Sequence, residues 1–119
     1  MTAPHLSPAE LKALVRTVPD FPHAGIQFRD ITTLIGHHQG MAASVHHLAE
    51  LADAAGAHKI AGMEARGFIF GAAVAVQLGI GFVPVRKPGK LPIDTIGIDY
   101  VLEYGTDRLE MDPGAIEPG

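Results

Sequence analysis

Two segments of this chain hold the groups best suited to bind an anion: residues 60–68, IAGMEARGF, and residues 86–92, RKPGKLP. The first is an apolar strand that runs into a Glu-Ala-Arg-Gly turn and then a helix, which points backbone N–H groups and Arg66 at one place. The second places Arg86, Lys87 and Lys90 directly after another apolar strand. Because the formal net charge is -4, cations gathered at one strand end predict a phosphorylated ligand.

The composition is that of one globular domain or part of one, with 119 residues, 47% hydrophobic and 18% charged. Cysteine is absent, which excludes a disulfide-stapled fold and a thiolate metal site. The acidic balance and the lack of a basic stripe argue against nucleic-acid binding. The longest nearly apolar stretch, residues 67–85, contains four glycines, Gln77 and Pro84 and is poor material for a membrane span. With no signal-peptide pattern at the start, the expected location is the cytoplasm.

The elements expected to position these groups begin with a helix over residues 8–18. Ser7 and Glu10 form a capping box, the apolar residues repeat at helical spacing, and Pro19 ends the pattern. Residues 20–34 show no sustained period and predict an irregular segment with short extended pieces. A second amphipathic helix is expected over residues 41–55, with Gly56 just beyond its end.

The central prediction is a right-handed, parallel βαβ unit with strands at residues 59–63 and 81–86 and a helix at 67–78. Pro84 favours an edge or a strand end for the second strand. Residues 98–104 and 106–111 predict a hairpin around Gly105. One crossover is fewer than a doubly wound sheet normally has, so the fold is either small and unusual or lacks a C-terminal portion.

Four motifs in this order, FPHAGIQFRDIT, GMEARGFIFGAA, FVPVRKPGKLP and LEYGTDRLE, resemble the adenine phosphoribosyltransferase family from Val18 to Gly119. The resemblance implies one type I phosphoribosyltransferase domain over residues 1–119: an α/β fold with a parallel sheet flanked by helices and a hairpin with a flexible loop. It also implies adenine plus 5-phosphoribosyl-1-pyrophosphate (PRPP) giving AMP plus pyrophosphate, with Mg²⁺ bound through PRPP, usually in a homodimer. The family's Asp-Asp pair and Thr-Gly-Gly-Thr ribose-phosphate loop do not occur in these 119 residues, so the domain is expected to be incomplete at its C-terminus.

For adenine, the resemblance assigns stacking to Phe28 and hydrogen bonds to the backbone around Gln27 and Arg29. Adenine offers a donor at N6 and an acceptor at N1, whereas 6-oxopurines reverse both, so a wrong base leaves buried polar groups unpaired. Judged on composition alone, Phe28 would be read as an ordinary core residue.

For the reaction, the resemblance assigns Ala65, Arg66 and Gly67 to the pyrophosphate turn, with Arg66 stabilising the leaving group. Glu64 either orders this turn or contacts a magnesium-bound water. Glu103 is the expected acceptor of the purine N7 proton. The remaining PRPP and pyrophosphate ligands implied are Arg86, Lys87, Lys90 and Tyr104. Without the resemblance, Arg66 could equally be a surface residue, and the other charged side chains would usually be solvated surface groups.

His46 and Glu50 share a helix face, but no third ligand has motif spacing, so no metal site formed by the protein is predicted.

The alternative function is a catalytically incomplete fragment that acts only as an adenine-binding or dimerisation module. A transcription regulator of the same fold would need a DNA-binding segment, for which residues 1–18 are too short.

Overall fold

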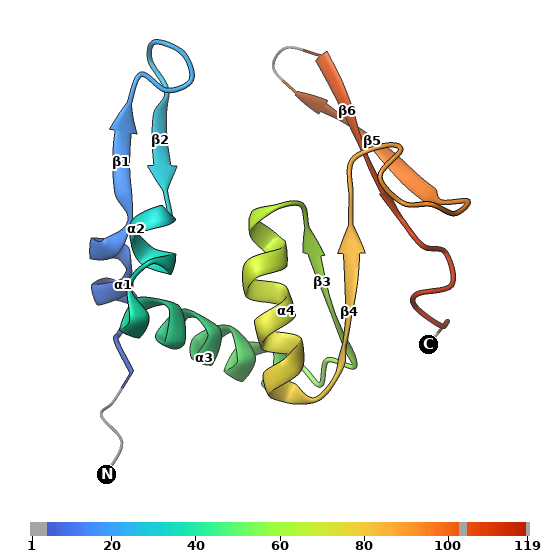
Figure 1. The fold of residues 1–119 in the computed structure, drawn as a ribbon, viewed down its shortest axis with the longest axis horizontal. Helices are drawn as coiled ribbons and strands as arrows, with labels where there is room; N and C mark the ends of the chain where they lie inside the picture. Colours follow the sequence, from blue (N-terminus) through green and yellow to red (C-terminus); the bar gives the residue numbers. More distant parts are fainter. Residues whose placement is uncertain (1–4, 103–104, 119) are drawn as a thin grey trace. The chain divides into compact units, whose positions relative to one another are not determined.

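The computed structural model describes residues 5–102 and 105–118. They divide into two compact units, residues 1–50 and 51–119. The chain runs through the elements labelled in Figure 1 in the order α1-β1-β2-α2-α3-β3-α4-β4-β5-β6. The predicted α/β class is confirmed, although the described strands form three separate two-stranded sheets.

In the first unit, α1 (Pro8–Leu14) is shorter than predicted. Its capping box forms as expected, since the Ser7 hydroxyl accepts from the Glu10 N–H while the Glu10 carboxylate accepts from the Ser7 N–H. The prediction that the helix reaches residue 18 is wrong, because Val15 is extended and Arg16–Pro19 forms β1. β1 pairs antiparallel with β2 (Gln27–Asp30), and cross-strand pairing outweighs the helical spacing of Val15 and Val18.

The segment predicted as irregular contains β2 and the short helix α2 (Thr32–Ile35). α3 (His38–Ala54) then begins three residues before the predicted start. Gly56 follows it with φ of 69°, the left-handed conformation expected after a helix end. The buried face of α3 includes Ala43, Val45 and Ala49.

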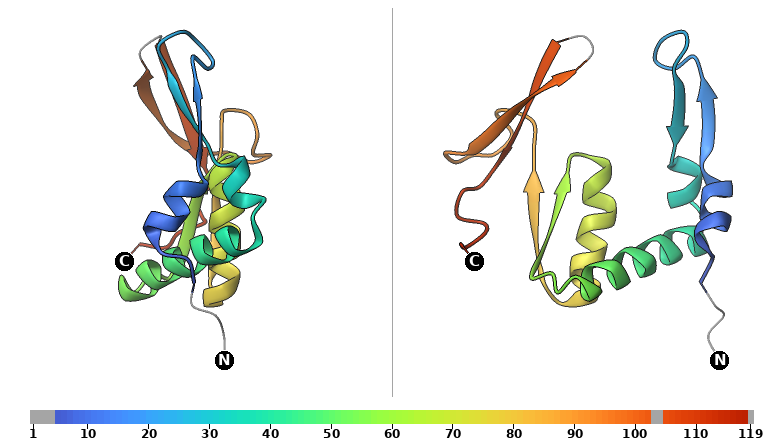
Figure 2. Two further views of the ribbon diagram at one scale, coloured as in Figure 1. Left: turned by 90° about the vertical axis from the view of Figure 1, so that its left-hand side faces the viewer. Right: turned by 180° about the vertical axis from the view of Figure 1, so that it is seen from behind.

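The second unit confirms the predicted βαβ crossover. β3 (Lys59–Met63) and β4 (Gly81–Val85) pair in parallel, and α4 (Arg66–Leu78) connects them. The turned views in Figure 2 show α4 lying along this strand pair. Because the strands are parallel, their carboxyl ends lie at one edge, where Met63 is opposite Val85.

α4 packs closely on the strands because small residues face Phe82. A Cβ atom on Gly62 would lie 2.6 Å from the Gly67 carbonyl oxygen, and one on Gly71 would lie 2.6 Å from the Phe82 ring. Such distances are too short for a Cβ, so a larger residue would force the Gly67 backbone or the Phe82 ring to move. Val74, Ala75 and Val83 are buried in this unit.

β5 (Ile96–Leu102) and β6 (Gly105–Met111) form the predicted hairpin, with Tyr100 opposite Asp107. Gly105, with φ of 145°, is the first residue of β6 and pairs with Leu102 of β5. Arg86, just after β4, exchanges two backbone hydrogen bonds of 2.8 and 2.7 Å with Glu110 of β6. These bonds fix the hairpin to the end of β4. Among the described residues, no helix has the length and apolar character needed to cross a bilayer.

Candidate anion-binding site

The turn from β3 into α4 places Glu64, Ala65, Arg66 and Gly67 at the carboxyl edge of the parallel pair. Ala65 is the N-cap residue and makes no side-chain capping bond; Arg66 is the first helical residue. The peptide bond between Glu64 and Ala65 is cis. A Cβ atom on Gly67 would lie 3.3 Å from the backbone of Gly62, so the turn sits tightly on β3. The start of a 13-residue helix presents backbone N–H groups here, which favours an anion.

Glu64 connects this turn to the segment after β4, residues 86–90, which we call the cation loop. Its Oε1 accepts from the Lys87 backbone N–H at 2.8 Å and from the Arg86 Nε at 3.2 Å. The hydrogen bond from Lys87 and the nearby charge of Arg86 hold the pKa of Glu64 below its usual range, against the opposing effect of burial. Glu64 therefore orders the turn as an ionised acceptor. Arg86 also lies over the Phe68 ring, 5.5 Å from its centroid.

The Lys87 side chain faces the hairpin. Its Nζ donates to the Tyr100 hydroxyl at 3.1 Å and forms a short ion pair with Asp107. These partners raise the pKa of Lys87, and Lys87 in turn lowers the pKa of Asp107. The predicted pyrophosphate ligand is thus a fixed cation that already has a carboxylate partner.

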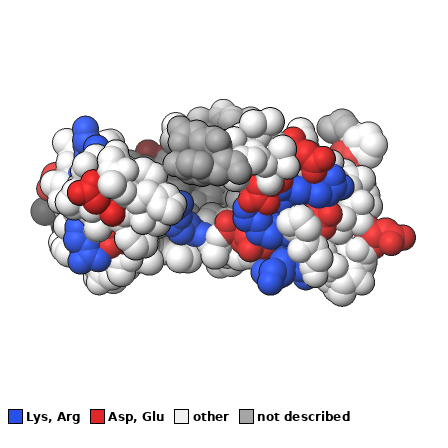
Figure 3. All heavy atoms as spheres, turned by 90° about the horizontal axis from the view of Figure 1, so that it is seen from above, with Lys and Arg blue, Asp and Glu red and all other residues white. Residues whose placement is uncertain are grey.

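Further charged groups on β6 hold the rest of the cation loop. Glu110 Oε1 accepts from the Gly89 N–H at 3.3 Å, and Glu110 Oε2 accepts from Arg108 Nε at 2.9 Å. Gly89 has φ of 78°, a conformation that suits glycine. Lys90 contributes an attraction that lowers the pKa of Glu64. On the face shown in Figure 3, basic and acidic side chains accordingly lie next to one another.

The purine-binding prediction falls on the first unit. Among the described strands, β2 pairs with β1 alone. Gln27 and Arg29 are two residues apart on β2, so their backbone groups point in the same direction. The Phe28 ring packs edge-on against Phe21, with 5.2 Å between centroids. The Arg29 guanidinium forms a short hydrogen bond to Thr17, which ties its side chain to β1.

Asp30 is the last residue of β2, and its carboxylate has several partners. It accepts from the backbone N–H of Thr32 at 2.9 Å and from the hydroxyl of the same residue at 2.6 Å, and forms a short ion pair with Arg16. The Thr32 hydrogen bonds, followed by those of Arg16, lower the pKa of Asp30 to about 2. The end of β2 is therefore anchored at neutral pH.

The predicted site residues that the structure describes lie in both units. Residues 65–67, 86, 87 and 90 lie around one edge of the second unit, whereas residues 27–29 belong to the first unit. Glu103 and Tyr104 lie outside the described residues. The sequence interpretation did not include Tyr100, Asp107 and Glu110, the partners of the cations, because only the strand register places them beside the cation loop.

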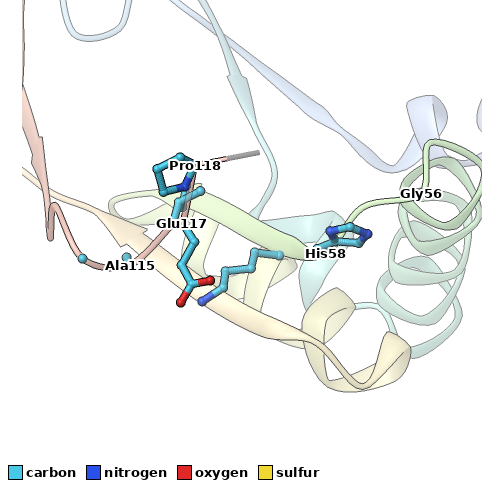
Figure 4. Close-up of a pocket in the computed structure, with 8 residues that line it drawn as sticks. Gly56, His58, Ala115, Glu117 and Pro118 are labelled. Atoms are coloured by element: carbon cyan, nitrogen blue, oxygen red, sulfur yellow. The ribbon is translucent and has the colours of Figure 1, made fainter.

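A pocket of about 670 Å³ lies elsewhere in the second unit, between the start of β3 and the segment after β6. His58 and Glu117 line it from these two sides (Figure 4). None of the predicted site residues lines this pocket.

Comparisons with known proteins test the family resemblance. No family model matches the sequence. The chain is 74% identical over 110 residues to an adenine phosphoribosyltransferase of Erythrobacter litoralis, which covers 92% of this chain and 62% of that protein. The crystal structure of adenine phosphoribosyltransferase from Thermoanaerobacter pseudethanolicus matches with a TM-score of 0.85 and 48% identity, over 90% of this chain and 62% of that chain.

The Saccharomyces cerevisiae enzyme, complexed with an imino-altritol bisphosphate and adenine, matches with a TM-score of 0.84 and 38% identity, over 93% of this chain and 65% of that chain. This chain therefore spans between 62% and 65% of the length of these relatives. Sequence and fold agree over nearly all of its own residues. On this evidence the chain belongs to the adenine phosphoribosyltransferase family, with the type I phosphoribosyltransferase fold.

Proposed function

We propose that the protein transfers the phosphoribosyl group of PRPP to adenine, giving AMP and pyrophosphate, as a purine-salvage enzyme. The Erythrobacter relative, 74% identical, carries the name of this activity. The observation that carries the proposal is Glu64, which holds Arg86 and Lys87 of the cation loop beside the helix start that follows the Glu-Ala-Arg-Gly turn. This arrangement suits a diphosphate.

The pyrophosphate end of PRPP is proposed to bind between the α4 start and the cation loop. Backbone N–H groups at residues 65–67 and the Arg66 guanidinium approach it from one side. Arg86, Lys87 and Lys90 approach it from the other and stabilise the negative charge that develops as pyrophosphate leaves. Lys87 exchanges Asp107 for a phosphate oxygen in this step, because its ammonium pairs with that carboxylate in the described state.

The adenine site is proposed at β2, with Phe28 stacking on the base and the backbone of Gln27 and Arg29 reading its edge. A complex of the Saccharomyces relative with adenine supports the choice of base. A stretch of backbone whose acceptor and donor match the N6 donor and the N1 acceptor of adenine discriminates against 6-oxopurines by up to about 10⁴-fold. Gln27 is exposed, so its backbone rather than a buried side chain supplies the recognition.

In the proposed reaction, adenine N9 attacks C1′ of PRPP as the bond from C1′ to the pyrophosphate oxygen breaks. Glu103 accepts the proton from N7, which keeps electron density on N9. Tyr104 lies next to it in sequence and is proposed to contact PRPP as the loop between β5 and β6 closes over the site. Both roles rest on the family resemblance.

Mg²⁺ is proposed to arrive bound to the PRPP phosphates, where it neutralises charge on the leaving group. The described residues fit this route. The Glu64 carboxylate, which belongs to the predicted turn, already accepts from Lys87 and Arg86 and does not form part of a carboxylate cage. The residues of this chain bind and orient the phosphates that carry the ion.

Three further features are proposed with this activity: a homodimer, a cytoplasmic location and a single, partial phosphoribosyltransferase domain over residues 1–119. The homodimer follows from the family resemblance, in which the cation loop reaches a neighbouring subunit. Light scattering coupled to gel filtration tests it directly, with a mass twice that of one 12.5 kDa chain expected.

The test of the activity is AMP formation from adenine and PRPP with Mg²⁺, followed by chromatography. We expect equal amounts of AMP and pyrophosphate, and no nucleotide when hypoxanthine replaces adenine. Adenine binding by calorimetry without any turnover would instead support the alternative, a module that only binds adenine or dimerises. No turnover, no adenine binding and a monomer in light scattering would contradict both.

A further inference from the structure

α3 brings three metal-ligating side chains together on the first unit. One ligand atom each from His46, His47 and Glu50 lies within 4.8 Å of the others. Spacing alone pairs His46 with Glu50 and offers no third ligand. The structure adds His47, which lies three residues before Glu50 and therefore on a neighbouring part of the same helix face.

His47 is oriented as metal-binding histidines usually are. Its Nε2 lies 2.7 Å from the Leu6 carbonyl oxygen. Because a carbonyl oxygen only accepts, Nε2 carries the hydrogen, and Nδ1 is the ring nitrogen left to bind a ligand. Histidine ligands typically donate their other ring N–H to such a group, which fixes the tautomer and the ring orientation.

His46 and Glu50 supply the other two donors. His46 Nε2 lies 2.9 Å from Glu50 Oε1, and the two side chains are 33% and 64% exposed. The His46 ring stacks on His5 with 4.0 Å between centroids and 16° between planes, which holds its plane in place. An ion and its water can reach a pair that is exposed to this degree.

The distances allow one ion to bind all three. Zinc–ligand bonds measure about 2.0–2.2 Å, so two ligands of one zinc ion lie no more than about 4.4 Å apart. The separation of up to 4.8 Å between the donor atoms closes by a small shift of the half-buried His46 ring within its stacked plane and a rotation of the exposed Glu50 side chain. Two imidazoles and a carboxylate select a transition metal ion rather than Mg²⁺ or Ca²⁺.

We propose that His46, His47 and Glu50 form a binding site for a divalent transition metal ion of the zinc type, with water completing the coordination. The site lies on α3 and uses none of the residues assigned to adenine or pyrophosphate. It is therefore independent of the proposed activity and of the magnesium carried by PRPP.

The test is calorimetric titration of the 119-residue chain with ZnCl₂ in the presence of excess Mg²⁺. We expect one zinc ion per chain. His46→Gln, His47→Gln and Glu50→Gln are each expected to weaken binding at least about tenfold, since each removes one of three ligands. The matched control is His38→Gln, which removes an exposed imidazole from the start of the same helix and is expected to leave binding unchanged.

Titration with Co²⁺ adds a spectroscopic readout, because visible absorption bands report inner-sphere imidazole and carboxylate ligands. Zinc binding that is absent, that Mg²⁺ displaces, or that all three variants retain would overturn the proposal. Equal loss in the His38→Gln control would overturn it as well. If His47→Gln loses the helical circular-dichroism signal, the exposed Glu50→Gln variant carries the test.

Discussion

At the scale of single residues, the side chains most important to the candidate site already have hydrogen-bonding or ionic partners. Glu64 accepts from both the backbone of Lys87 and the guanidinium of Arg86. A carboxylate in this position holds the Lys87 backbone and the Arg86 side chain at one edge of the parallel strand pair. The chemistry of the turn therefore depends on a residue that need not touch the substrate.

Replacing Glu64 with Gln should weaken the hold on Arg86 while retaining an oxygen that can accept from the Lys87 N–H. We expect the KM for PRPP to rise roughly tenfold with a smaller change in kcat, since a hydrogen bond between charged groups is lost and the loop is less ordered. Initial-rate kinetics measure this change. Glu117→Gln, a substitution of the same type at the pocket away from the turn, serves as the control. Equal KM values for Glu64→Gln and the unmodified protein would contradict the positioning role.

Replacing Asp107 with Asn removes the carboxylate that competes with a phosphate for Lys87. We expect pyrophosphate to bind up to about fivefold more tightly, the range that a partly exposed ion pair allows. Calorimetry with pyrophosphate measures the change. Asp99→Asn on the same hairpin, where the carboxylate pairs with Arg108 at 3.1 Å, is the control with no expected effect. Weaker binding by Asp107→Asn would show that Asp107 positions Lys87 instead of competing for it.

At the scale of the elements, the sequence best predicted the helices and strands that neighbouring residues determine. The β3–α4–β4 unit lies within one residue of its predicted bounds, because apolar strands, a turn and a helix follow one another without ambiguity. The end of α1 was missed, since Val15 and Val18 fit a helical period and only pairing with β2 shows that β1 is extended. The partners of Lys87 were missed for the same reason, because the register of a hairpin is a non-local property.

The close packing of α4 on the strands can be tested at Gly71. An added Cβ would lie 2.6 Å from the Phe82 ring, and such overpacking costs about 1–3 kcal/mol. The better helix propensity of Ala offsets about 1 kcal/mol of this. We expect Gly71→Ala to lower the free energy of unfolding by up to about 2 kcal/mol in urea melts.

The control for this substitution is Gly81→Ala, where an added Cβ meets no atom within 4 Å and stability should change little. Phe82→Leu in the Gly71→Ala background removes ring atoms from the clash and should recover part of the loss. A stable Gly71→Ala protein without this second change would show that Phe82 moves aside at no cost.

At the scale of the whole molecule, carboxylates in both units have lowered pKa values, so the stability of the fold depends on pH. Hydrogen bonds and nearby cations lower the pKa of Asp30, Glu64, Asp107 and Glu110 in the folded chain. A group with a depressed folded pKa binds fewer protons when folded than when unfolded. Its contribution to stability is therefore complete above the unfolded pKa and declines as the pH falls through the folded value.

Asp30 gives this argument its clearest test, because its pKa falls from 3.8 to about 2. The destabilising effect of Asp30→Asn on the free energy of unfolding should be constant above about pH 5, shrink between about pH 4 and 2, and vanish below that range. Urea melts at several pH values measure the difference between the variant and the unmodified protein. Asp53→Asn, at an exposed position on α3, is the matched control. A destabilisation by Asp30→Asn that stays the same from pH 7 to pH 2 would show that it arises from lost packing, because only the ionised carboxylate is linked to protons.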